Sequence, residues 1–325
     1  MQNVVVTYDT MPEEKALFQE ILGGIASLTF LTEISPTQRG QALTNANVLL
    51  SWNFPQEIST QEYSLLQHMS LIQLITAGVD HIPYADLPTF VSVADNQGAY
   101  AIPMAEHVMA MVLALAKRLL VEQQKLMRGE FDDHTLNRSL VGTTAGIIGF
   151  GGTGRATARV MRAFGMKIYA INQSGTSAEP TEFIGTLRDT EYVSRACDVV
   201  VISLPLTTAS KGLIGKAELS WMKPDAILIN VARGAIIDEE TLYAHAKNHP
   251  SFSVGIDTWW EEPLRGGAFR MSYPFLELPN VLGSPHNSAL VSHVVADAAH
   301  QAAKNVAQFL KGEKVMGMVR REDYL

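Results

Sequence analysis

The chain of 325 residues is long enough for two domains, because one domain typically takes about 100–200 residues. Hydrophobic residues make up 47% and charged residues 18%, a globular composition that excludes the disordered and collagen-like classes. The formal net charge of −8 argues against a nucleic-acid partner, since nucleic-acid-binding domains usually carry a basic face.

The cysteine content and the apolar segments indicate a cellular location. Cys197 is the one cysteine, so no disulfide can form within the chain, which fits a reducing compartment. The first residues lack the basic and apolar regions of a signal peptide. The most apolar stretch, Val108–Ala116, is far shorter than the roughly 20 residues that span a membrane. We therefore expect a cytoplasmic protein that does not contact membranes.

The first ninety residues alternate short β-branched runs with helical patterns. Helices are predicted over Glu13–Leu22 and Gln61–Met69. Strands are predicted over Val4–Thr7, Ser27–Leu31, Val48–Leu50, Leu71–Ile75 and Val91–Ala94. Strands that alternate with helices are typical of βαβ units and a parallel sheet.

A single long helix is predicted next, from Pro103 to Gly129. At about 1.5 Å per residue it would span roughly 40 Å, enough to bridge two domains or two subunits. Its stretch Val108–Ala116 is free of charge, so we expect this stretch to lie in or beside a dimer interface.

A second alternation of strands and helices follows the long helix. Its predicted strands are Thr144–Ile148, Lys167–Ile171, Asp198–Ser203, Ala226–Asn230, Phe252–Asp257 and Val281–Gly283, and a last helix covers Ser288–Lys311. The expected fold class is α/β, with two Rossmann-like or flavodoxin-like doubly wound parallel sheets and an interdomain cleft. The expected domains are residues 1–96 with 287–325, and residues 97–286.

A glycine-rich turn joins the predicted strand Thr144–Ile148 to a helix. Its sequence has the pattern G-x-G-x-x-G, with Gly149, Gly151 and Gly154. The first glycine permits a tight turn, the second lets the backbone approach a pyrophosphate, and the third lets the helix pack closely on the strand. The free N–H groups at the helix start then favour phosphate. Strand, turn and helix together predict a dinucleotide site, although a tight turn without a ligand would have the same pattern.

The next strand ends in Asn172, where the dinucleotide fingerprint usually has an acidic residue. Asn172 can hydrogen-bond a ribose but repels no 2′-phosphate, so the cofactor is NAD or NADP. The segment from Asn137 to Ala178 contains five basic and no acidic side chains, which we expect to attract an anionic cofactor.

Three polar residues follow consecutive strands: Arg233, Glu262 and His286. Ligands of open parallel sheets bind beyond the carboxyl ends of the strands. Arg233 can bind a carboxylate, His286 can exchange a proton with a carbonyl oxygen, and Glu262 can orient the imidazole. Each also has a structural interpretation: an arginine paired with Asp238, a solvated turn residue and a helix-start residue. As a set they suit the reduction of a keto acid.

The chain resembles the D-isomer-specific 2-hydroxyacid dehydrogenases along essentially its whole length. The resemblance is carried by the glycine turn and four further motifs, namely Ser203–Thr207, Asn230–Gly234, Asp257–Pro263 and Ser284–His286. It implies Arg233, Glu262 and His286 as catalytic residues. The cofactor-binding residues that it implies are Gly149, Gly151, Gly152, Thr153, Gly154, Asn172, Leu204, Pro205, Val231, Ala232 and Asp257.

The resemblance also implies a substrate and an assembly. The N–H groups of Ala77, Gly78 and Val79 would bind the substrate carboxylate together with Arg233, and the protein would be a homodimer. The expected reaction is hydride transfer between NAD(P)H and a small 2-keto acid, such as glyoxylate or hydroxypyruvate, with His286 as acid and base. Glu262 favours this over formate oxidation, because the related formate dehydrogenases have Gln there. Trp52 is a candidate lining residue of the substrate cleft.

Other interpretations remain open. A nicotinamide-sensing, corepressor-like binding module on the same fold would bind cofactor with little turnover, because fold alone does not determine function. A methyltransferase would leave the three strand-end residues without a role. His245 and His249 have a metal-compatible spacing on a predicted helix, but no third ligand is evident and we expect no metal.

Overall fold

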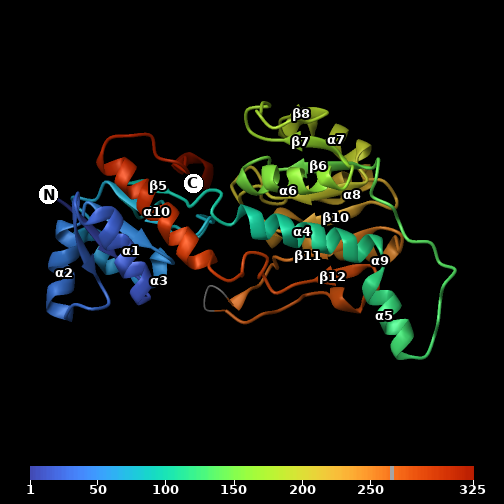
Figure 1. Cartoon of the computed structure of the whole chain (residues 1–325), viewed down its shortest axis with the longest axis horizontal. Helices are drawn as coiled ribbons and strands as arrows, with labels where there is room; N and C mark the ends of the chain where they lie inside the picture. The colour runs from blue at the N-terminus through green and yellow to red at the C-terminus, as the bar shows by residue number, and fades with distance from the viewer. Residues whose placement is uncertain (264–266) are drawn as a thin grey trace. The chain divides into compact units, whose positions relative to one another are not determined.

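The computed structural model describes residues 1–263 and 267–325 and divides them into two compact units. Unit 1 comprises Met1–Tyr100 and Val291–Leu325, and unit 2 comprises Ala101–Leu290 (Figure 1). The chain passes from one unit to the other after residues 100 and 290, four residues after each of the expected boundaries at 96 and 286. One reason is Tyr100, whose hydroxyl donates to the Ile75 carbonyl of unit 1 at 2.9 Å. No described helix is long and apolar enough to cross a membrane.

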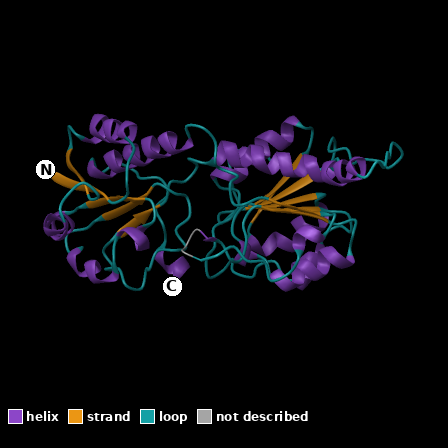
Figure 2. Cartoon of the chain, turned by 90° about the horizontal axis from the view of Figure 1, so that it is seen from below, coloured by secondary structure: helices purple, strands orange, loops and turns teal. Residues whose placement is uncertain are grey.

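Unit 1 contains a five-stranded parallel sheet in the order β2-β1-β3-β4-β5, the flavodoxin-like order. Helices lie on both of its faces (Figure 2). Its strands are β1 (Gln2–Val6), β2 (Ala26–Phe30), β3 (Val48–Ser51), β4 (Leu71–Leu74) and β5 (Ser92–Ala94). Its helices are α1 (Pro12–Leu22), α2 (Pro36–Asn45), α3 (Phe54–Glu57), η1 (Thr60–Leu65), α10 (Val294–Leu310) and η6 (Arg321–Tyr324).

The predicted helix over Gln61–Met69 is wrong in type and length. The chain instead forms the short 3₁₀ helix η1, which ends at Leu65. Tyr63, Leu66 and Met69 are buried, at a spacing of three residues. Leu66 and Met69 lie beyond the end of η1, in the non-helical segment that follows, and they pack with Tyr63 in the core of unit 1.

Unit 2 contains a seven-stranded parallel sheet in the order β12-β11-β10-β9-β6-β7-β8, the Rossmann order with one further strand. Its strands are β6 (Thr144–Ile148), β7 (Lys167–Ile171), β8 (Phe183–Gly185), β9 (Val199–Ile202), β10 (Ile227–Asn230), β11 (Ser253–Ile256) and β12 (Val281–Gly283). Its helices are α4 (Ala101–Ala116), α5 (Leu119–Met127), α6 (Gly152–Ala163), η2 (Leu187–Asp189), α7 (Thr190–Ala196), α8 (Lys216–Trp221), η3 (Gly234–Ile236), α9 (Glu239–Asn248) and η5 (Phe275–Glu277). The expected fold class is confirmed, although the edge strand β8 was not predicted.

The central strands of unit 2 are apolar on both faces because helices cover both (Figure 2). Alternate residues enter different cores. Ile147, Val201 and Ile229 pack in one hydrophobic cluster, while Ile148, Val200 and Leu228 pack in the other. This double burial explains why the strands read as continuous apolar runs in the sequence.

The prediction of one long helix is wrong, because α4 ends at Ala116 and α5 begins at Leu119. Arg118 has a left-handed backbone with φ 53° and ψ 31°, which turns the chain. Lys117 stabilises the turn, because its ammonium donates a hydrogen bond to the Arg138 carbonyl at 2.8 Å.

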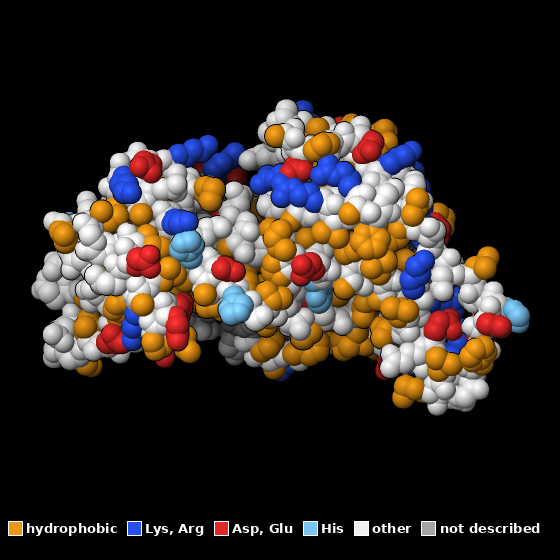
Figure 3. Space-filling view, viewed as in Figure 1, with side chains coloured by type: hydrophobic (Ala, Val, Ile, Leu, Met, Phe, Trp, Pro, Cys, Tyr) orange, Lys and Arg blue, Asp and Glu red, His pale blue; other side chains and the backbone are white. Residues whose placement is uncertain are grey.

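The charge-free stretch Val108–Ala116 has two different faces. One face is buried in the core of unit 2 and comprises Val108, Met109, Met111, Val112 and Ala116, which pack with residues of β6, β9 and β10. The low charge of this face therefore has its cause inside the unit and needs no partner subunit. The other face is more exposed, and Figure 3 shows hydrophobic side chains gathered over α4.

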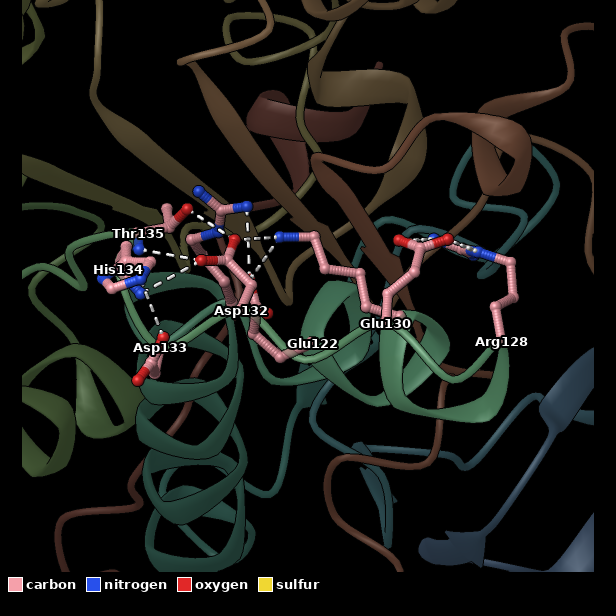
Figure 4. Close-up of polar contacts among 9 residues, drawn as sticks. Glu122, Arg128, Glu130, Asp132, Asp133, His134 and Thr135 are labelled. Carbon is pink, nitrogen blue, oxygen red and sulfur yellow. Dashed lines mark hydrogen bonds and ion pairs between the residues drawn. The ribbon is translucent and has the colours of Figure 1, made fainter.

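A polar network holds α5 and the segment that follows it, beyond the end of the sheet (Figures 1 and 4). Lys125 contacts Glu122 at 3.2 Å and Asp132 at 2.6 Å. The carboxylate of Asp132 also accepts hydrogen bonds from the backbone and hydroxyl of Thr135. These donors, the Lys125 ammonium foremost, hold the pKa of Asp132 well below its ordinary range.

We expect replacement of Glu62 by Gln to destabilise unit 1 at neutral pH. Glu62 accepts hydrogen bonds from Arg39 Nε at 2.6 Å and from the Ser59 N–H at 2.9 Å, and Arg39 lowers the pKa of Glu62 to about 2. Charge-assisted bonds of this kind contribute about 1–2 kcal/mol. The lowered pKa means that this stability is present above the ordinary pKa of a glutamate and is lost as the pH falls through the folded value.

Urea unfolding of wild type and Glu62→Gln at neutral pH and near pH 3 measures this difference. The gap between the two proteins should narrow at the acidic pH. Glu20→Gln is the matched control, because Glu20 is exposed. Equal stability of wild type and Glu62→Gln at neutral pH would contradict the prediction.

Candidate active site

The glycine-rich turn between β6 and α6 is shaped by close packing. Gly149 has a positive φ of 107°, and a Cβ there would lie 2.3 Å from the Leu204 nitrogen. A Cβ on Gly154 would lie 2.3 Å from the Gly149 carbonyl oxygen. A Cβ on Gly151 meets nothing within 4 Å. Two glycines are thus required by packing, whereas Gly151 faces open space that a ligand can enter.

The start of α6 can receive a phosphate. The helix begins at Gly152, and no side chain caps its N-terminus. Its first N–H groups therefore remain available, and the helix dipole favours an anion. Thr153 lies in this first turn, and its hydroxyl contacts the Met104 sulfur at 3.8 Å. The residues present fit a pyrophosphate at this turn.

Asn172, at the end of β7, uses its amide within its own loop. Its Oδ1 accepts from the Gly175 N–H at 2.7 Å, and its Nδ2 donates to the Thr176 carbonyl at 2.8 Å. The side chain that the sequence offered for the ribose therefore also shapes the loop from 172 to 176. This loop has no carboxylate that would repel a 2′-phosphate.

Basic side chains gather over α6, as Figure 3 shows, but part of their charge is offset. Arg159 and Arg162 both form ion pairs with Glu179, the residue just after the segment counted in the sequence. The Arg159 guanidinium holds the pKa of Glu179 below its ordinary value. The expected attraction for an anionic cofactor is therefore weaker than five unpaired charges would provide.

Glu262 and His286 lie together in unit 2. His286 Nδ1 is 2.8 Å from Glu262 Oε2, and Glu262 Oε1 accepts from the Trp259 N–H at 2.7 Å. His286 has a left-handed backbone with φ 51°, and its N–H donates to the Asp257 carbonyl at 2.8 Å. Because Nδ1 donates its hydrogen bond to Glu262, Nε2 is the ring nitrogen that can contact a substrate oxygen.

The backbone around Arg233, after β10, is fixed from two sides. Asn230 Nδ2 donates to the Arg233 carbonyl at 2.9 Å, and Asn230 Oδ1 accepts from the Ala232 N–H at 3.0 Å. A Cβ on Gly234 would lie 2.5 Å from the Trp259 carbonyl carbon. The Arg233 loop therefore packs against the segment that leads to Glu262.

Asp257, after β11, is fully buried and organises the segment after β12. Its Oδ1 accepts from Ser284 Oγ at 2.6 Å and from the Asn287 N–H at 3.2 Å. Ser284 in turn contacts His107 Nε2 at 2.9 Å. Neither Ser284 nor His107 was a predicted site residue. Both residues are far apart in the sequence, and no pattern within α4 indicated their contact.

Leu204 and the two tryptophans take part in packing. Leu204 lies against the glycine turn, and Ser203 Oγ donates to the Gly149 carbonyl at 2.9 Å. Trp259 is buried, and its indole N–H donates to the Ser284 carbonyl at 2.8 Å. Trp260 stacks on Phe275 with 5.4 Å between the ring centroids. Both indoles thus help to build the loops of the site.

In unit 1, Ala77, Gly78 and Val79 form a loop after β4. Their backbone N–H groups make no hydrogen bond within the described part of the chain, which leaves them available to an anion. Trp52 follows β3 and lines a pocket of about 460 Å³. The described lining of this pocket includes Asp9, Glu14 and Glu57 and contains no lysine or arginine.

Within the described residues, no group of three or more His, Cys, Asp or Glu side chains is arranged to hold a metal ion. His245 and His249, the pair with metal-compatible spacing, stack with ring centroids 4.2 Å apart. Burial and the neighbouring His249 lower the pKa of His245 to about 4.

A Rossmann-ordered sheet with an open glycine turn defines a dinucleotide-binding domain. Residues 109–288 match the NAD-binding domain of the D-isomer specific 2-hydroxyacid dehydrogenases, and the chain belongs to this family. The resemblance inferred from the motifs is thereby confirmed. The family comprises NAD(P)-dependent oxidoreductases that act on 2-hydroxy and 2-keto acids.

Several relatives carry specific names. D-3-phosphoglycerate dehydrogenase of Methanocaldococcus jannaschii is 28% identical over 98% of this chain, which spans only 59% of that protein. Glyoxylate reductase of Aeropyrum pernix is 31% identical over 71% of this chain and 70% of that protein.

Two solved structures share the fold. A D-isomer specific 2-hydroxyacid dehydrogenase from Xanthobacter autotrophicus, in complex with NADPH and MES, has a TM-score of 0.82 and 22% identity, covering 100% of this chain and 99% of that one. D-lactate dehydrogenase from Aquifex aeolicus, complexed with NAD and lactic acid, has a TM-score of 0.73 and 25% identity, covering 96% of both chains.

Proposed function

We propose that this chain interconverts a small 2-keto acid, such as glyoxylate or hydroxypyruvate, and the corresponding D-2-hydroxy acid. The observation that carries the proposal is the contact of 2.8 Å between His286 Nδ1 and Glu262 Oε2. A carboxylate bound to Nδ1 fixes the orientation of the imidazole, so that Nε2 can give a proton to a carbonyl oxygen. NAD(P)H, when bound, supplies the hydride.

In the proposed mechanism each residue has one task. Arg233 of unit 2 binds the substrate carboxylate with its planar guanidinium. In unit 1, the N–H groups of Ala77–Val79 are the proposed substrate-binding groups. The His286 imidazolium donates the Nε2 proton to the carbonyl oxygen as the alkoxide develops, and in the opposite direction it takes the proton back. Glu262 keeps the imidazole oriented throughout.

The proposed cofactor contacts follow the turn and the strand ends. The N–H groups of Gly151, Gly152 and Thr153 would hold the pyrophosphate, and Asn172 would contact the adenosine ribose. The remaining proposed contacts are Leu204, Pro205, Val231, Ala232 and Asp257. Because the Asn172 loop has neither a carboxylate nor a basic side chain, we propose that the protein accepts both NADH and NADPH.

A substrate panel tests the proposed function. Glyoxylate, hydroxypyruvate, pyruvate, phosphohydroxypyruvate and a bulkier keto acid are each mixed with enzyme and either NADH or NADPH, and the loss of nicotinamide absorbance is followed. We expect the highest kcat/KM with glyoxylate or hydroxypyruvate. Cofactor binding without turnover on any keto acid would favour the binding-module alternative.

We also propose that the protein is a homodimer. Apolar side chains are exposed on α5 and the segment after it, among them Leu119, Leu126, Met127, Phe131 and Leu136. The polar network of Figure 4 holds the fold of this segment and leaves these side chains uncovered. Exposed apolar patches of this kind typically mark protein–protein contacts. Light scattering should give twice the chain mass, and Leu126→Glu with Met127→Glu should give the monomer mass.

A further inference from the structure

His107 is the start of a hydrogen-bonded chain that ends on a buried carboxylate. Its Nε2 is 2.9 Å from Ser284 Oγ, and Ser284 Oγ donates to Asp257 Oδ1 at 2.6 Å. A hydroxyl has one proton, and the proton of Ser284 goes to Asp257. Ser284 can therefore only accept from His107, so the His107 imidazole carries its proton on Nε2.

The carboxylate at the end of this chain holds the backbone around His286. Asp257 Oδ1 accepts from the Asn287 N–H at 3.2 Å, and Oδ2 accepts from the Ser288 N–H at 3.4 Å. The Asp257 carbonyl accepts from the His286 N–H at 2.8 Å. Asp257 thus contacts three consecutive residues, of which the first has the left-handed backbone.

The charge balance also connects His107 to Asp257. Asp257 is fully buried, and a buried carboxylate is costly unless donors or a cation compensate it. His107 Nε2 lies 3.7 Å from Asp257 Oδ1, while a quarter of the His107 side chain stays exposed. His107 therefore links solvent to the carboxylate that organises the site. The arrangement is not a nucleophilic triad, because the carboxylate contacts the serine and not the far nitrogen of the imidazole.

We propose that His107 is a positioning residue for the proposed reaction, on which this inference rests. By donating to Ser284, His107 determines the direction of the hydrogen bonds from His107 to Ser284 and from Ser284 to Asp257. These bonds hold the Asp257 carboxylate in place, and Asp257 in turn holds the backbone that positions His286. It touches neither substrate nor cofactor in this role. Its loss should therefore lower kcat and leave the KM for the keto acid unchanged, because misplacement of a reacting group acts on the chemical step.

Two substitutions of His107 test the proposal. His107→Leu removes the donor, and we expect kcat to fall about tenfold with KM within twofold of wild type. His107→Gln keeps an N–H at a similar reach, and we expect kcat within threefold of wild type. If His107 had a merely structural role, both variants would have a lower melting temperature, and His107→Leu would not show a lowered kcat with an unchanged KM. His134→Leu is the control, since the His134 side chain is 93% exposed.

A double-mutant cycle with Ser284→Ala gives the second readout. If the two residues act in one chain, His107→Leu with Ser284→Ala should lower kcat no more than about twofold beyond the worse single variant. Three results would overturn the inference: a double variant whose loss of kcat is the product of the two single losses, an unchanged kcat in His107→Leu, or a kcat of His107→Gln as low as that of His107→Leu. Absence of turnover in wild type would overturn the proposed function itself, and this inference with it.

Discussion

Replacement of His286 by Asn will lower kcat for keto-acid reduction by about 10³-fold, because the proton donor to the carbonyl oxygen is lost. Asparagine is the right substitute, since His286 has a φ of 51° and Asn tolerates the left-handed region better than other side chains. The N–H group that donates to the Asp257 carbonyl is retained. The loss should therefore reflect chemistry and not a displaced backbone.

Binding of NADH and NADPH separates these two causes. Fluorescence titration should give a cofactor Kd within about threefold of wild type, because only an acid–base group is removed. His134→Asn, at the exposed histidine, should leave both kcat and Kd unchanged. Turnover near the wild-type rate in His286→Asn would mean that another group supplies the proton.

Replacement of Gly149 by Ala will destabilise unit 2 by about 3 kcal/mol or more. Two causes act together: the residue has a φ of 107°, and the new Cβ would lie 2.3 Å from the Leu204 nitrogen. Leu204 belongs to backbone that follows β9, so neither partner can move without disturbing a central strand. Thermal melting of the purified protein measures the loss.

Gly151→Ala is the matched variant two residues further along the same turn. A Cβ at Gly151 meets nothing within 4 Å, so this variant should melt like wild type. Its methyl group points into the open space of the turn, and we expect it to weaken NADH binding at least tenfold. If Gly149→Ala folds normally, or if Gly151→Ala binds NADH like wild type, the assignment of the turn is wrong.

The strands of unit 2 show which elements a local sequence pattern can predict. The bounds predicted for β6, β7 and β12 are confirmed to the residue. Each is an apolar run that ends at a glycine or polar residue, so the signal is contained in the strand itself. The edge strand β8 was missed, whereas β12, which is equally short and forms the other edge of the sheet, was predicted.

Two helical predictions failed for reasons that lie outside the segments concerned. The break before α5 depends on the left-handed Arg118 and on the bond from Lys117 to the distant Arg138 carbonyl. Arginine has no preference for that backbone, so the sequence carried no sign of it. The helix predicted over Gln61–Met69 stops at Leu65, and Leu66 and Met69 reach the core of unit 1 from the turn that follows η1.

The candidate site also contains residues that the sequence predicted and a contact that only the structure shows. The order of Arg233, Glu262 and His286 along the chain, each after a strand, indicated one edge of a parallel sheet, because parallel strands all end on the same side. The contact of His107 with Ser284 joins residues 177 positions apart, and no pattern within α4 announces it.

The sequence by itself determined the fold class, the family, the glycine turn and the residue types at the strand ends, because these depend on short-range geometry and on spacing. The tertiary structure alone decided which side chains meet. It paired Glu262 with His286, occupied Asn172 within its own loop, offset Arg159 and Arg162 with Glu179, and buried one face of Val108–Ala116. Such contacts depend on how distant segments pack, and burial then sets the strength of each charge and hydrogen bond.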